Sequence, residues 1–85
     1  MTYKVIIKPV ALKTLKKLPK DIQLRIRASI DLLAINPRPP KAIKLVNRSE
    51  YRIRVSTYRV VYQIRDNELI ILIVKVGHRK NVYEV

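Results

Sequence analysis

The sequence predicts a single α+β domain, with an N-terminal strand, an antiparallel helical hairpin and then a three-stranded antiparallel meander, all in one curved sheet. Three observations predict it. A short β-branched segment opens the chain, apolar residues then recur at helical spacing, and from residue 51 they alternate with polar ones. All 85 residues, 1–85, are assigned to one domain, because a chain of this length has no room for a second.

The N-terminal half predicts one strand and two helices. Residues 3–7 (YKVII) have the β-branched composition of a short strand, and Pro9 suits the first turn of a helix. Pro19 ends that helix, and Asp21 is the expected N-cap of the next. The apolar stripes of the two helices are Ala11, Leu12, Leu15 and Leu18, then Ile22, Ile26, Ile30 and Leu33. The prolines in 37–40 predict an extended connection.

The C-terminal half predicts three strands joined by two-residue turns. The strands cover residues 51–55, 58–65 and 68–76, with turns at 56–57 and 66–67. The last strand is apolar on both faces, so we expect it inside the sheet and covered above and below, with the first strand of the chain at its free side.

The register of the first hairpin predicts which side chains share a face. A two-residue turn sets Val55 opposite Tyr58 and Arg54 opposite Arg59. The face expected to pack on the helices carries Tyr51, Ile53, Val55, Tyr58, Val60, Tyr62 and Ile64. The other face carries Arg52, Arg54, Arg59, Gln63 and Arg65. We expect this second face to be open to solvent or covered only by a partner protein.

Arg54 opposite Arg59 is a like-charge pair that destabilises the sheet, and no carboxylate in the strands reaches it. Guanidiniums gathered without counter-ions are typical of an oxyanion or phosphate site, because their planar forks bind phosphate through two hydrogen bonds. The alternative interpretation is a solvated polar face that keeps the protein soluble.

The composition indicates a polyanionic partner. The formal net charge is +13, from 19 Lys and Arg against six Asp and Glu. Such self-repulsion favours nucleic acid as a partner, an acidic protein as a second one, and a membrane surface least. Helix lysines such as Lys13 and Lys17 are expected to add to RNA binding through their charge. The chain has no cysteine, secretory signal or membrane span, so we expect a cytoplasmic protein.

The C-terminal segment holds further candidate residues. Gly77, the only glycine, is expected to let the chain leave the last strand sharply. His78 is the only histidine and an acid–base candidate near neutral pH, or else a polar surface residue. Arg79 and Lys80 add two cations, and Tyr83 could serve as a stacking platform, a proton-transfer group or a hydrophobic clamp. One histidine and scattered acids form no metal-binding cluster, so we expect neither metal nor cofactor.

The element order and three phrases, YRIRV, YRVVYQI and VGHRKNVY, resemble the RelE branch of the RelE/ParE toxins across the whole chain. The resemblance implies a toxin of a type II toxin–antitoxin system, an endoribonuclease (mRNA interferase) that inhibits translation by cleaving mRNA in the ribosomal A site. It implies metal-free attack of a ribose 2′-OH on the adjacent phosphate. It also implies neutralisation by a small acidic RelB-like antitoxin.

The resemblance assigns roles to particular residues. Five are implied or considered as catalytic: Arg54, Arg59, His78, Arg79 and Tyr83. RNA or phosphate binding falls to Arg52, Arg54, Lys80, Lys13 and Lys17. Some RelE-like enzymes have lysine at the first two strand positions, and an arginine is a poor general base. Proton abstraction is therefore left to Tyr83 or His78, or to electrostatic activation of the 2′-OH.

Two other functions remain open from the sequence. A ParE-like protein that poisons DNA gyrase without being an enzyme would need this fold but not the arginine cluster. An inactive relative would bind only its antitoxin or nucleic acid.

Overall fold

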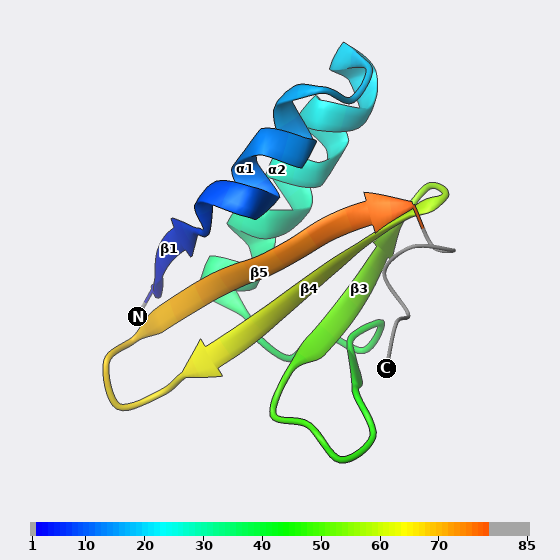
Figure 1. The fold of residues 1–85 in the computed structure, drawn as a ribbon. Coiled ribbons are helices and arrows are strands. Elements are labelled where there is room, and N and C mark those ends of the chain that lie inside the picture. The colour runs from blue at the N-terminus through cyan, green and yellow to red at the C-terminus, as the bar shows by residue number, and fades with distance from the viewer. Residues whose placement is uncertain (1, 79–85) are drawn as a thin grey trace.

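The computed structural model describes residues 2–78, which form two helices on one face of a five-stranded mixed sheet (Figure 1). The elements are β1 (Lys4–Ile7), α1 (Pro9–Lys16), α2 (Lys20–Ile35), β2 (Ile43–Lys44), β3 (Tyr51–Val55), β4 (Tyr58–Arg65) and β5 (Ile70–His78). The α+β class, the helical hairpin and the meander of β3, β4 and β5 are confirmed. The two-residue edge strand β2 was not predicted.

The strand order is β1-β5-β4-β3-β2, so β5 lies inside the sheet between β1 and β4. β1 runs parallel to β5, with Lys4 paired to Ile70 and Ile7 to Ile73. The predicted interior position of the last strand, with the first strand at its free side, is therefore confirmed. The expectation that helices cover this strand above and below is wrong. They cover one face, where Ile71 and Ile73 are buried, and Ile70 and Leu72 on the other face are only half-buried.

The core lies between the helical hairpin and the sheet. α2 contributes the predicted stripe of Ile22, Ile26, Ile30 and Leu33, all buried, and α1 contributes Ala11 and Leu15. The sheet contributes Ile53, Val55, Val60, Tyr62, Ile71, Ile73 and Val76. Tyr51, Tyr58 and Ile64 pack against this cluster, so the apolar face predicted from the hairpin register is confirmed in full.

The hairpin between β3 and β4 has the predicted register, with Val55 paired to Tyr58 and Arg54 to Arg59. Ser56 has φ 57°, the left-handed conformation that tight two-residue hairpin turns require. The next turn differs from its prediction. It spans residues 66–69, with Leu69 at φ 55°, and β5 therefore begins at Ile70, not residue 68.

Two expectations about local conformation are wrong. Gly77 does not take the chain out of the strand, because it lies within β5 and its φ is not positive. Asp21 is not the N-cap of α2. Pro19 holds that position. Asp21 lies in the first turn, where the positive end of the helix dipole still stabilises its negative charge. Within residues 2–78, no helix is long and apolar enough to cross a membrane.

Polar contacts join three distant segments at the end of the sheet where β4 turns into β5. The Arg38 guanidinium forms an ion pair with Asp66 at 2.9 Å, and the Tyr3 hydroxyl donates to the same carboxylate at 2.7 Å. Arg38 also donates to the Tyr51 hydroxyl at 3.2 Å. The hydrogen bonds from Arg38 and then Tyr3 lower the pKa of Asp66.

Tyr62 links the sheet to the proline-rich connection. Its side chain is fully buried, and its hydroxyl donates to the Pro37 carbonyl oxygen at 2.7 Å. Burial raises the pKa of Tyr62 to about 12, so the hydroxyl remains a donor across the physiological range. On the sheet, its ring stacks on that of Tyr51 at a centroid distance of 5.9 Å.

The Asp66 contacts predict a pH dependence of stability. A carboxylate with a lower pKa in the folded chain stabilises the fold above its unfolded pKa, about 3.9, and loses that effect as the pH falls through the folded value. Between pH 6 and 2.5, Asp66→Asn should therefore show a flatter decline in thermal midpoint than the parent. Glu68→Gln, in the same turn, serves as the control. A parent and an Asp66→Asn variant with parallel profiles would contradict this prediction.

Removing the Tyr62 hydroxyl should destabilise the fold. Tyr62→Phe keeps the buried ring but leaves the Pro37 carbonyl without its donor, so we expect a loss of about 1 kcal/mol in the free energy of unfolding. Denaturant unfolding measures it. Tyr58→Phe is the matched control, since the Tyr58 hydroxyl has no hydrogen-bond partner within residues 2–78. Equal stabilities for the two variants would show that the buried bond contributes nothing.

Candidate functional site

The sheet face opposite the helices carries a row of functional candidates across three strands. Arg54 on β3 pairs with Arg59 on β4, and Arg59 pairs with Gly77 on β5. Directly paired residues point to the same face, so the two guanidiniums share it with a glycine that has no side chain. The predicted like-charge pair is therefore confirmed, and its neighbour on β5 places no Cβ beside Arg59.

A second row runs parallel to the first. Arg52 on β3 pairs with Val61 on β4, and Val61 pairs with Lys75 on β5. Arg52 and Lys75 therefore flank Val61 on the same face as Arg54 and Arg59. We call the side chains of Arg52, Arg54, Arg59 and Lys75 the cationic face.

Lys75 was not among the residues predicted for this face. A bulge gives β5 one extra residue, Val74, between the pairs Val61–Lys75 and Tyr62–Ile73. The extra residue reverses the alternation and directs Lys75 away from the core. The only available signal was a single lysine in the otherwise apolar run ILIVKV, and simple alternation from Ile73 assigns that lysine to the helix side.

Burial differs sharply along the cationic face. Arg54 is exposed, whereas Arg52 retains 7% and Arg59 only 4% of its accessible surface. The expectation that this face is open to solvent is therefore wrong for Arg52 and Arg59. Arg52 lies between Ile43 of β2 and Val61 of β4, whereas Arg54 lies beyond the two residues that pair with β2 and has a strand neighbour only on β4.

Burial changes what these guanidiniums can do. A charge held away from bulk water interacts more strongly with a nearby anion, because the local dielectric constant is lower. Arginine stays protonated and presents donors in a planar fork, which suits phosphate oxygens and excludes it as a proton acceptor. The face can therefore bind and polarise a phosphate, while proton removal requires another group.

The structure does not bring His78 to the cationic face. His78 pairs with Tyr58, which lies on the helix side of the sheet, and the two rings meet edge to face at 5.7 Å. Its side chain is exposed, but it belongs to the opposite face from Arg54 and Arg59. His78 was considered as a catalytic residue because it is the only histidine, but the strand register places it on the other face from the arginines.

The remaining candidates lie elsewhere. Lys13 and Lys17 are exposed at and just beyond the last turn of α1, on the side of the sheet that the helices cover (Figure 1). Arg79, Lys80 and Tyr83 lie outside the described residues. Both ion pairs between two residues of the range 2–78, Arg38–Asp66 and Arg65–Glu68, involve the turn between β4 and β5. Within this range no cluster of metal-ligating side chains occurs.

Comparison with known proteins places this geometry in a family. Residues 5–83 match the model of the ParE toxin of type II toxin–antitoxin systems (parDE). The chain is 38% identical over 82 residues to an Escherichia coli protein named as a RelE-like toxin, with 94% of this chain and 86% of that protein covered. It is 33% identical over 88 residues to a Methanocaldococcus jannaschii protein named as a RelE toxin, covering 99% and 98%.

Solved structures agree with the sequence comparison. The archaeal RelE–RelB complex of Pyrococcus horikoshii contains a chain that matches with a TM-score of 0.84 and 33% identity, covering 96% of this chain and 100% of that one. The same two helices and mixed sheet are therefore present in a RelE-type toxin. The chain belongs to the RelE/ParE family of type II toxin–antitoxin toxins and is similar to its RelE members.

Proposed function

We propose that this toxin is a ribosome-dependent endoribonuclease that cleaves mRNA in the ribosomal A site and so inhibits translation in the cytoplasm. The observation that carries the proposal is the cross-strand row of Arg54, Arg59 and Gly77. Two guanidiniums that share one face of a sheet suit a phosphate, because the planar donor fork of each arginine can bind phosphate oxygens through two hydrogen bonds.

The proposed step needs neither metal nor cofactor. The ribose 2′-oxygen loses its proton and forms a bond to the adjacent phosphorus, and the bond from phosphorus to the 5′-oxygen breaks. The leaving 5′-oxygen takes up a proton, which gives a 2′,3′-cyclic phosphate and a 5′-OH end. Negative charge grows on the non-bridging oxygens during attack, and donors fixed in advance at those oxygens lower the barrier.

In the proposal, the roles of Arg52, Arg54 and Arg59 are assigned from their positions on the cationic face. Arg59, buried in the middle of the sheet, holds the scissile phosphate, and exposed Arg54 and neighbouring Arg52 complete its neutralisation. In the proposal Arg79 supports the leaving oxygen, and Tyr83 stacks on a splayed base or takes the 2′-OH proton. Lys80, Lys13 and Lys17 add long-range attraction for RNA. His78 has no role in the step, because its register position is on the other face.

An acidic RelB-like antitoxin is the proposed protein partner. The Pyrococcus horikoshii relative was solved as a complex with RelB. The net charge of +13 on this chain supports a partner of the opposite sign, which neutralises the toxin until it is released.

One observation supports a second function. The matching family model is described as a ParE toxin, so poisoning of DNA gyrase without any enzymatic step remains the alternative. Expression of the toxin separates the two. The interferase leaves A-site mRNA cuts with 5′-OH ends by primer extension, whereas a gyrase poison leaves protein-linked DNA breaks.

Arg59→Ala should lower the rate of single-turnover cleavage on programmed ribosomes by about 10²–10³-fold, because it removes a donor that acts in the transition state. Arg79→Ala should behave alike, and both variants should keep near-normal ribosome affinity. Tyr83→Phe should lose rate only if its hydroxyl takes part. His78→Ala is the matched control from the end of β5, and we expect it to cleave like the parent. Full activity in both arginine variants would favour the gyrase-poison function.

Lys75→Gln should reduce cleavage mainly by lowering the affinity for RNA, and should affect the rate of the chemical step less. Lys75 is exposed on the cationic face, two residues before Gly77, and contributes a point charge near the phosphate. We expect a higher half-saturating ribosome concentration and a nearly unchanged rate at saturation. Lys4→Gln on β1 is the control for loss of one sheet charge. If Lys75→Gln left binding at the parent level, Lys75 would not belong to the RNA surface.

A further inference from the structure

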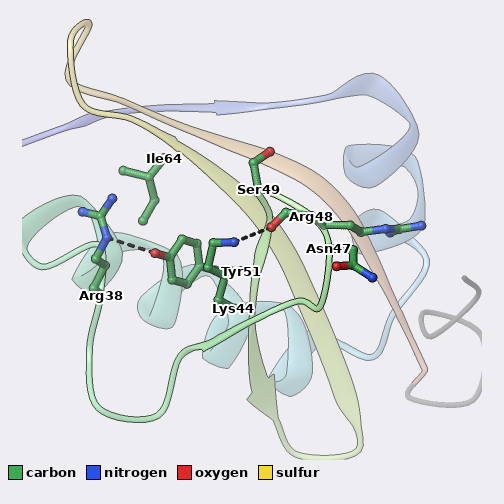
Figure 2. Close-up of a pocket in the computed structure, with 7 residues that line it drawn as sticks. All are labelled: Arg38, Lys44, Asn47, Arg48, Ser49, Tyr51 and Ile64. Atoms are coloured by element: carbon green, nitrogen blue, oxygen red, sulfur yellow. Dashed lines mark hydrogen bonds between the residues drawn. The ribbon is translucent and has the colours of Figure 1, made fainter.

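A second cationic surface lies beside the edge strand β2, on the helix side of the sheet. An open hollow of about 520 Å³ forms where β2, the loop after it and the 36–42 connection meet β3 and β4 (Figure 2). Its lining residues are Arg38, Lys44, Asn47, Arg48, Ser49, Tyr51 and Ile64. We call it the edge hollow.

The edge hollow is separate from the cationic face. Lys44 pairs with Tyr51, and Tyr51 pairs with Tyr62, which is part of the core beneath the helices. These paired residues share the helix side of the sheet, so Lys44 and Tyr51 lie on the opposite side from Arg52 and Arg59. A ligand of the edge hollow therefore does not occupy the proposed catalytic surface.

The lining is rich in donors and holds no carboxylate. The Lys44 ammonium donates a hydrogen bond to the Arg48 carbonyl oxygen at 2.7 Å, which orients the lysine without neutralising its charge. Neither Lys44 nor Arg48 forms an ion pair with another residue in the range 2–78. Arg38 shares its charge with Asp66, which lies outside the lining. The hollow thus has a net positive charge and suits an anionic, acceptor-rich ligand.

The cations are spread along the edge hollow and do not converge on one point. In Figure 2 the guanidiniums of Arg38 and Arg48 lie at its two ends, and the ammonium of Lys44 lies between them. A single phosphate ion would need donors that converge around one centre. A row of cations matches the successive phosphates of an extended nucleic-acid strand.

The lining favours RNA over an acidic peptide. Protein interfaces depend on a few apolar or aromatic anchors that are buried on binding. The one aromatic ring here, Tyr51, already stacks on Tyr62 and has the Arg38 guanidinium 5.5 Å from its centroid. The hollow therefore offers charge and hydrogen bonds, which are the contacts that position a sugar–phosphate backbone.

We propose that the edge hollow is an accessory site for the backbone of single-stranded RNA, on the opposite side of the sheet from the cationic face. Lys44 and Arg48 contact its phosphates directly, and Arg38 extends the row. The choice of RNA as the polyanion rests on the proposed function. The site itself is defined by its charges and acts in binding, not in cleavage.

The test measures binding of a fluorescein-labelled single-stranded RNA oligonucleotide to the purified chain by anisotropy over a range of salt concentrations. Each lost phosphate contact should reduce the log–log salt slope by about 0.7, so Lys44→Gln/Arg48→Gln should reduce it by about 1.4. Arg25→Gln/Arg27→Gln removes the same charge from exposed positions of α2 and should leave the slope at the parent value.

Arg48→Gln alone guards against a local structural effect, because it keeps the bond from Lys44 to the residue 48 carbonyl, and it should reduce the slope by about 0.7. Equal slopes for the parent, Arg48→Gln and the double variant would overturn the proposal. So would a double variant that binds RNA normally but no longer binds poly-glutamate, which would assign the hollow to an acidic protein. The assay contains no ribosome, so a failure of ribosomal cleavage bears on the proposed function alone.

Discussion

The two-residue turn between β3 and β4 is the constraint on which the rest of this molecule depends. It sets Arg54 opposite Arg59, and in the same step it directs Ile53, Val60 and Tyr62 into the core. A slip of one residue would bury guanidiniums under the helices and expose the apolar side chains. The register that makes the fold stable is therefore the register that gathers the cations. Neither property can change alone.

The sequence was informative wherever one face of an element is buried. Alternation in β3 and β4 and the stripe of α2 follow directly from burial, so their faces were predicted correctly. The failures occur where geometry depends on the partner strand. No local pattern reveals the extra residue Val74, so Lys75 was assigned to no site and Gly77 was treated as the end of the strand.

Contacts between segments distant in the sequence could not be predicted from local sequence patterns either. Arg38 meets Asp66 across 28 residues, and β2 exists only because β3 provides a partner for two residues of a loop. Such contacts depend on the relative placement of segments that are distant in sequence. The edge hollow is built from them, which explains why its residues did not stand out beforehand. His78 shows the converse, since its place directly after Gly77 in the sequence puts it on the opposite face from Arg59.

The two proposed RNA surfaces are connected by the shortness of β2. Consecutive strand residues point to opposite faces, so Ile43, paired with Arg52, lies on the cationic side, while Lys44 lies on the edge-hollow side. With only two residues in this edge strand, a nucleic-acid strand that leaves the edge hollow has little protein to cross before it meets Arg52. A longer edge strand would separate the two surfaces and expose more unpaired backbone to other chains. In this geometry a short edge strand limits exposed backbone and, under the two proposals, would leave a continuous path for RNA.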